Sequence, residues 1–257
     1  MLTKRQKISI SSLILATGLF LLPEFNDTIR PLFIVAIIIA SYFLSVWAIY
    51  GAFSPFELVS LFALPVILTA SFGLYISQFA VTTGVRLSLV IIYIGLMYTI
   101  LLSQNIFTVS VERNIPLVRA ARTVGYLASL FVSFAFFSLI FGLGLPNLVF
   151  SFVAGTVSVL LFAQGLWQIE LKGTNPVHLT YFSLLGGLIL GEVSWALSFW
   201  PLDPPKVGLA LAAAFYVVLG ILQRHTLDNL NTRVTIEYLF VAIAVVIILI
   251  ITTSWGI

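Results

Sequence analysis

The chain has 257 residues, of which 61% are hydrophobic and only 8% are charged, and its net charge is +3. Soluble domains carry about 25% charged residues, so this composition excludes a water-soluble globular protein. The absence of cysteine excludes disulfides, thiolate metal sites and cysteine nucleophiles. The few positive charges flank apolar runs, which indicates membrane topology rather than nucleic-acid binding.

Apolar runs follow one another along the whole chain. A hydrocarbon core about 30 Å thick needs about 20 apolar residues in a helix. The pattern predicts an all-α, polytopic transmembrane helix bundle that forms a single integral membrane domain over residues 1–257. We expect about nine spans, at residues 8–22, 31–50, 56–76, 85–102, 124–142, 148–167, 179–200, 205–222 and 236–255.

The first run imitates a secretory signal, because Lys4, Arg5 and Lys7 precede it. No small-residue cleavage site follows Leu22, so we expect this segment to remain as the first helix.

Local signals mark several boundaries between the runs. Residues 54–57, Ser-Pro-Phe-Glu, form a capping box with proline in the first turn, which starts the third helix. Asn175 before Pro176 and Asp203 before Pro204 open the seventh and eighth helices. Residues 142–147 hold two glycines and a proline, which predicts a tight turn between antiparallel helices five and six.

The positive charges predict the orientation. With nine alternating spans, nine basic residues fall on one side and three, Arg30, Arg86 and Lys206, on the other. Because cytoplasmic loops carry the excess of Lys and Arg, the N-terminus is expected in the cytoplasm and the C-terminus outside. The nine are Lys4, Arg5, Lys7, Arg113, Arg119, Arg122, Lys172, Arg224 and Arg233.

Glu192 is the first candidate site residue, because it is the only acidic residue well inside a predicted span. It lies about 4 Å beyond the midpoint of the seventh span. Carboxylates at such depth are costly and often serve proton, cation or ligand binding, although one can also simply tie helices together. Trp195, one turn further, is expected to line the same site or the interfacial aromatic belt, and Arg86 and Lys206 are candidate partners.

The seventh span also repeats small residues at every fourth position, at Ser183, Gly187 and Gly191. This spacing predicts close helix packing, within the bundle or in a homodimer. Pro65 falls in the middle of the third span, where it removes a backbone donor and kinks the helix. Broken helices often mark transporter sites, but proline is also common in ordinary membrane helices.

Basic residues on the cytoplasmic side form a second candidate region. Arg119 and Arg122 lie one turn apart in a segment expected to form an amphipathic surface helix that leads into the fifth span. Such residues anchor a protein to anionic lipid head groups or bind a partner. The set comprises Arg113, Arg119, Arg122, Arg224 and Arg233.

Enzyme signatures are absent from the sequence, which favours a protein that is not an enzyme. His178 and His225 show no metal-ligand spacing, and we expect no catalytic residue, metal or cofactor. Three hypotheses remain: a transporter-like bundle for a small molecule or lipid, a non-catalytic membrane subunit or scaffold, and a lipid-modifying enzyme. The expected partners are the bilayer, anionic lipids, and a second copy or another membrane protein. The expected location is a bacterial or archaeal cytoplasmic membrane.

Overall fold

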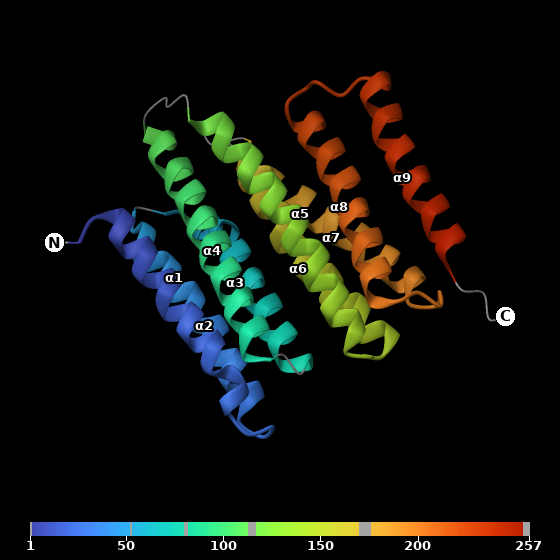
Figure 1. Ribbon diagram of the computed structural model, residues 1–257. Coiled ribbons are helices and arrows are strands. Elements are labelled where there is room, and N and C mark those ends of the chain that lie inside the picture. Colours follow the sequence, from blue (N-terminus) through green and yellow to red (C-terminus); the bar gives the residue numbers. More distant parts are fainter. Residues whose placement is uncertain (1, 52, 80–81, 113–116, 170–175, 254–257) are drawn as a thin grey trace. The chain divides into compact units, whose positions relative to one another are not determined.

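The computed structural model describes residues 2–51, 53–79, 82–112, 117–169 and 176–253. Throughout these ranges the only regular elements are helices (Figure 1). They are α1 (Lys4–Leu21), the short 3-10 helix η1 (Leu22–Glu24), α2 (Arg30–Ile49), α3 (Pro55–Gln78), α4 (Thr83–Glu112), α5 (Val118–Gly142), α6 (Asn147–Trp167), α7 (Pro176–Leu197), α8 (Pro204–Thr226) and α9 (Thr232–Thr252).

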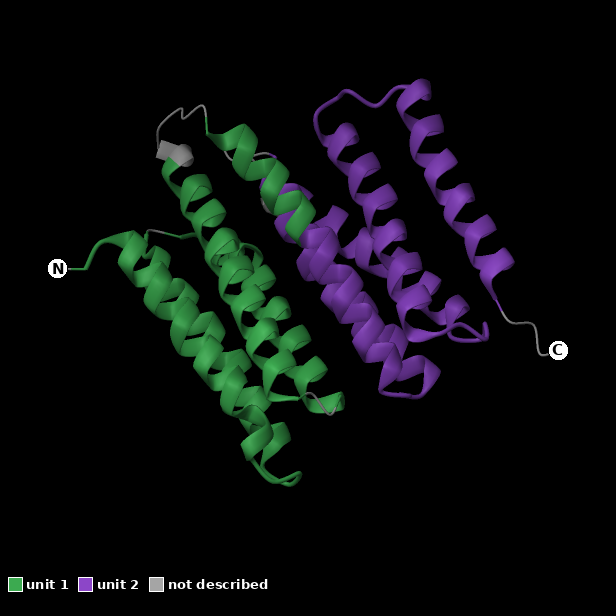
Figure 2. Ribbon diagram, in the orientation of Figure 1, with its two compact units in different colours: residues 1–128 green, residues 129–257 purple. Residues whose placement is uncertain are grey.

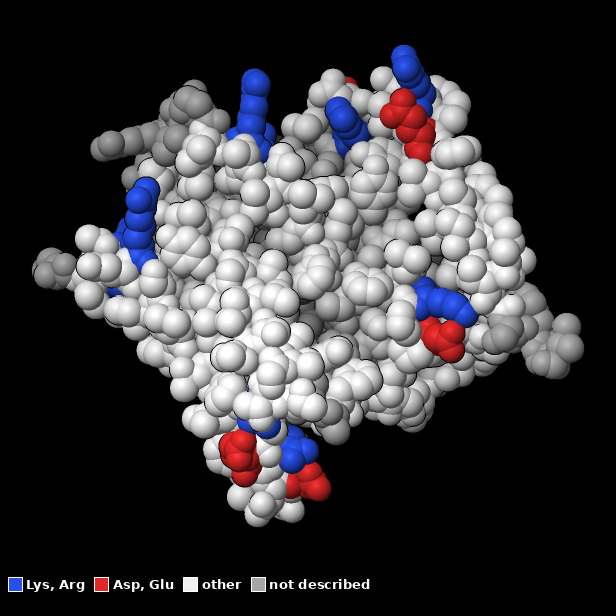
Figure 3. Space-filling view, in the orientation of Figure 1, with Lys and Arg blue, Asp and Glu red and all other residues white. Residues whose placement is uncertain are grey.

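Each of the nine α-helices in the described ranges is long and apolar enough to cross a membrane. Most charged residues lie near helix ends in the sequence. Most of the face in Figure 3 shows neither basic nor acidic side chains. Long helices with apolar middles are typical of integral membrane proteins, because lipid offers no hydrogen-bond partners and a helix satisfies its own backbone groups. The all-helical prediction is confirmed for the described residues.

Most predicted boundaries differ from the observed ones by four residues or fewer, but α4 is a clear exception. The predicted fourth span ended at residue 102, whereas the helix continues to Glu112. Ser103, Gln104 and Asn105 do not end it, and the Ser103 hydroxyl donates to the Thr99 carbonyl oxygen one turn back, a bond that is compatible with a helix. The Gln104 amide instead finds a partner on α3.

The start of α5 also differs from the prediction. The expected surface helix and fifth span form one continuous helix from Val118, so Arg119 and Arg122 lie in the first turns of α5. Capping explains other starts: the predicted box is confirmed at Ser54 and Glu57, and an unpredicted one, from Thr3 to Gln6, begins α1 before the expected residue 8.

The helices form two compact units, residues 1–128 and residues 129–257 (Figure 2). In unit 1, α3 is the most buried helix and packs against α2 and α4, while α1 packs against α2 and α4. The Phe62 ring of α3 meets Tyr42 of α2 edge-on, with ring centroids 6.0 Å apart. The core of unit 1 therefore surrounds α3.

In unit 2, α6 and α7 form the most extensive helix pair, and α8 packs against α6, α7 and α9. Glycines allow close contacts between helices in this unit, and Gly208 is one example. A Cβ atom on Gly208 of α8 would lie 2.7 Å from the Phe134 carbonyl oxygen of α5, so α5 and α8 approach each other through bare backbone.

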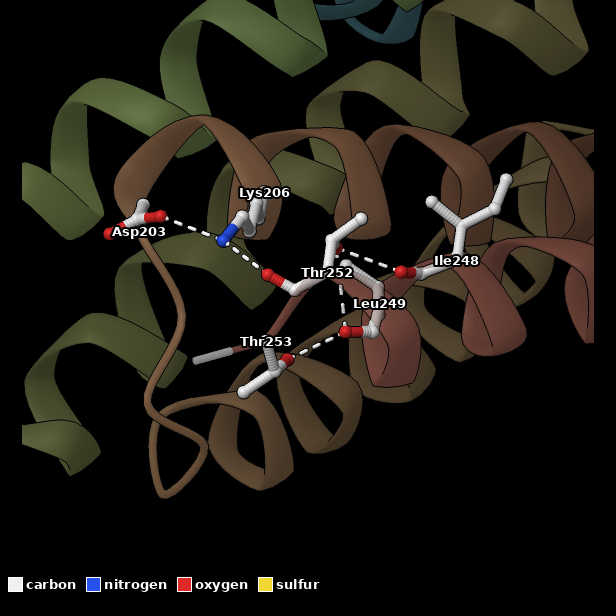
Figure 4. Close-up of polar contacts among 6 residues, drawn as sticks. All are labelled: Asp203, Lys206, Ile248, Leu249, Thr252 and Thr253. Atoms are coloured by element: carbon white, nitrogen blue, oxygen red, sulfur yellow. Dashed lines mark hydrogen bonds and ion pairs between the residues drawn. The ribbon is translucent and has the colours of Figure 1, made fainter. Parts of the chain in front are cut away.

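The last helix, α9, is the most exposed and is held along α8. The rings of Tyr216 and Tyr238 pack at an angle of 58°, with centroids 5.5 Å apart. At the other end of α9, Lys206 donates to the Thr252 carbonyl oxygen at 2.8 Å and forms an ion pair with Asp203 at 2.8 Å (Figure 4). A cation on the last carbonyls of a helix satisfies an orphan acceptor and complements the helix dipole.

Candidate functional site

Glu192 lies on α7 with its side chain exposed. It makes no hydrogen bond or ion pair with any residue that the structure describes. Because α7 runs from Pro176 to Leu197, Glu192 is about 8 Å from the helix midpoint rather than the 4 Å expected from the predicted span. The carboxylate thus lies closer to the helix end than expected and faces away from the helices packed on α7.

The residues around Glu192 form an exposed apolar stripe along one side of α7, here called the α7 stripe. Leu188 is 62% exposed and Trp195 is 48% exposed. Successive members are three or four residues apart, so they lie on one side of the helix. The stripe consists of Tyr181, Leu184, Leu188, Glu192, Trp195 and, just after the helix end, Phe199.

The three cations expected on the same side as Glu192 already have acidic partners. Arg86 binds Glu24 at 2.8 Å and lies over the Phe20 ring, 5.4 Å from its centroid. Arg30 pairs with Asp27 at 2.9 Å, and Lys206 pairs with Asp203. Arg86, expected as a partner of Glu192, is instead held within unit 1 by Glu24.

The small residues of α7 lie against α6. A Cβ atom on Gly187 would be 2.9 Å from the Gly155 carbonyl oxygen and closer still to Val159. Gly191 faces the Gly155 Cα, and Ser183 is buried on the same side. The α6 and α7 backbones therefore touch along this face, which leaves the α7 stripe on a different side of the helix.

Pro65 is buried within α3, and the helix continues through it. Proline has no backbone N–H, so the Leu61 carbonyl oxygen loses its usual donor four residues later. The Gln104 side-chain amide of α4 donates to that oxygen instead. Pro65 is therefore surrounded by protein, and a neighbouring helix repairs the missing hydrogen bond.

Four of the five basic residues proposed to bind lipid lie in the described part of the chain, and Arg113 lies outside it. Arg119 and Arg224 are exposed, and the Arg233 side chain is 90% exposed and 3.5 Å from Glu237. Arg122 is half-buried. Each residue lies at a helix end, where it is able to meet lipid head groups or water.

Sequence reasoning did not predict the surroundings of three buried polar residues. Gln104 and Tyr93 of α4 both contact α3, and Gln164 of α6 is 1% exposed with neither amide atom hydrogen bonded. Each glutamine was a usable signal, since a buried amide needs a partner. The partner of Gln104 could not be predicted, because Leu61 lies 43 residues away in the sequence. Among the described residues, no three metal-binding side chains come together.

Comparison with known proteins gives a family and no assigned activity. No curated protein and no solved structure matches the chain. The model of one family, DUF5656, described as a protein of unknown function, matches residues 16–252 and thus covers all nine α-helices in whole or in part. The chain therefore belongs to the DUF5656 family.

Proposed function

We propose that the nine described helices cross a membrane, with the N-terminus in the cytoplasm and the C-terminus outside. The nine-to-three distribution of basic residues supports this orientation. The exposed Arg119, Arg224 and Arg233 then face the cytoplasm and bind anionic lipid head groups. A bacterial or archaeal cytoplasmic membrane is the simplest setting for this charge bias.

Within that membrane, we propose that the protein is a non-catalytic subunit that assembles with another membrane protein through the α7 stripe. The observation that carries this proposal is the unpaired Glu192 carboxylate within the exposed, mostly apolar α7 stripe. A substrate site would place the carboxylate in an enclosed cavity, whereas Glu192 faces outward. An outward carboxylate on a membrane helix is best explained by a partner that covers it.

The partner is a transmembrane helix with one Lys or Arg level with Glu192. An acidic side chain facing lipid costs on the order of 2–3 kcal/mol on insertion scales, and an opposite charge offsets much of this cost. The cations Arg30, Arg86 and Lys206 are already paired, so the charge complement must come from elsewhere. A second copy would bring another Glu192 to the same stripe and place like charges together.

Photo-crosslinking in native membranes tests this assignment. A photoreactive amino acid at Leu188 should trap one protein whose crosslinked span carries Lys or Arg. The same amino acid at Phe240 of α9, which is 71% exposed, is the matched control and should trap lipid. Glu192→Gln should lower the Leu188 adduct about tenfold, the effect of losing about 1.4 kcal/mol, and Glu192→Asp should retain most of it. Only lipid adducts, adducts between two copies, or a yield indifferent to Glu192 would reject the partner.

A transporter-like bundle is the second candidate, favoured by Pro65 in the middle of α3, where the helix lacks one backbone hydrogen bond. The chain lacks cysteine, so a single cysteine at Ala70 gives an unambiguous probe. A membrane-impermeant thiol reagent should not reach this buried position in a subunit. Labelling from one side of the membrane would favour a water-filled path and hence transport.

A further inference from the structure

Residues of α4 form hydrogen bonds with α3 both before and after Pro65, where α3 lacks one backbone hydrogen bond. Before the proline, the Gln104 amide donates to the Leu61 carbonyl oxygen. After it, the Thr69 hydroxyl donates to the Pro65 carbonyl oxygen at 2.8 Å and lies 2.9 Å from the Tyr93 hydroxyl. Since the single Thr69 hydrogen is used on Pro65, Tyr93 is the donor to Thr69. We name this pair of α4 contacts, made by Gln104 and Tyr93, the α3 clamp.

Both clamp residues are fully enclosed, since Gln104 is 1% exposed and Tyr93 is 0% exposed. Water therefore has little access to the Leu61 carbonyl group, and an unpaired carbonyl in such surroundings is costly. The other amide atom of Gln104, Oε1, has no hydrogen-bond partner. A single hydrogen bond thus fixes the Gln104 amide, and breaking that bond frees the segment of α3 before Pro65 from α4.

We propose that α4 holds α3 rigid at Pro65: the clamp fixes the helix where its backbone hydrogen bond is missing, and release of Gln104 converts this point into a hinge. The segment before Pro65 then changes its angle relative to the segment after it, which Tyr93 still holds through Thr69. Neither the partner assignment on α7 nor the transport alternative is needed for this inference.

A double-mutant cycle tests whether Gln104 replaces the missing backbone donor. Gln104→Leu should lower the thermal midpoint of the purified protein by about 3–8 °C, because it leaves a buried carbonyl unpaired. In a Pro65→Ala background, residue 65 regains its N–H, so Gln104→Leu should cost less than half as much. Pro65→Leu provides a second background if the alanine variant folds poorly. Equal costs with and without the proline would overturn the role of Gln104.

Distances along α3 test the hinge itself. Spin labels on cysteines at Val59 and Tyr75, which are exposed on either side of Pro65, should lie about 24 Å apart along the helix. Gln104→Leu should broaden the distance distribution, and adding Pro65→Ala should narrow it again. Gln164→Leu, the same change at another buried glutamine, should leave the distribution unchanged. A distribution that stays narrow in Gln104→Leu would overturn the hinge even if the stability cycle agreed.

Discussion

The two units hold their central helix pairs together by different means. In unit 1, α3 and α4 are joined by side-chain hydrogen bonds around Pro65. In unit 2, α6 and α7 meet through Gly155, Gly187 and Gly191, with little side chain between the backbones. Apolar helices in lipid gain little from hydrophobic burial against one another, so either hydrogen bonds or close packing must supply specificity. We therefore expect added side-chain volume to destabilise the α6–α7 contact of unit 2, and loss of polar groups to destabilise the α3–α4 contact of unit 1.

The largest expected effect is at the glycine contact of unit 2. Gly187→Ala should lower the free energy of unfolding by about 3 kcal/mol, the upper part of the range for overpacking. Its Cβ atom would meet the Gly155 carbonyl oxygen, which belongs to backbone and cannot rotate away. The measurement is unfolding of the purified protein in mild detergent. Gly95→Ala in α4 is the control and should be neutral, since a Cβ there meets nothing within 4 Å. Similar costs for both variants would contradict the packing account.

A smaller effect should follow from breaking the second contact of the α3 clamp. Thr69→Val leaves the buried Tyr93 hydroxyl without an acceptor and should cost about 1–2 kcal/mol. Tyr93→Phe should cost less, because Thr69 still donates to the Pro65 carbonyl oxygen. Denaturation of the two single variants and the double variant measures the asymmetry. If Tyr93→Phe proved the more harmful change, the assigned direction of the hydrogen bond would be wrong.

Gln164→Leu should be stabilising, by about 1 kcal/mol. Both amide atoms of Gln164 are buried without hydrogen-bond partners, so an apolar side chain of similar size removes a desolvation cost. Gln223→Leu is the contrasting change, because its amide donates to the Gly165 carbonyl oxygen at 3.0 Å. That variant should be destabilised, and a loss of stability in Gln164→Leu would mean that its amide has a partner in the folded protein.

The smallest effect is expected at the contact between α8 and α9. Lys206→Met removes the donor to the Thr252 carbonyl oxygen and should cost about 0.3–1 kcal/mol, since its ion-pair partner Asp203 is 70% exposed and solvent screens the pair. Hydrogen exchange at the C-terminal turn of α9 should rise while exchange in α6 stays the same. Unchanged protection of α9 would show that its contacts with α8 suffice without Lys206.

Much of the fold was predictable from local patterns, because each helix needs about 20 apolar residues and ends where capping residues, glycine or proline gather. The Ser54–Glu57 capping box shows how well such local signals work. The length of α4 was not predictable, since the buried Gln104 amide finds a distant acceptor, the Leu61 carbonyl. Local sequence does not reveal a hydrogen bond across 43 residues.

The candidate site was only partly readable from the sequence. Glu192 stood out as an acid within an apolar run, but whether it faced inward or outward depends on which side of α7 packs on α6. The small residues at Ser183, Gly187 and Gly191 marked a packing face, yet their counterpart Gly155 is an isolated glycine in α6. The Glu24 partner of Arg86 was likewise hidden, because the two residues lie 62 positions apart.

The proposal that Glu192 binds a cation on a partner helix is tested most directly by exchanging the two charges. Glu192→Lys should abolish the Leu188 crosslink, and changing the crosslinked partner's basic residue to glutamate should do the same. Combining both changes should restore the adduct to near its original yield, because the pair is re-formed with its charges reversed. If the adduct persists in Glu192→Lys, or stays absent in the combined variant, Glu192 does not pair with a cation of the partner helix.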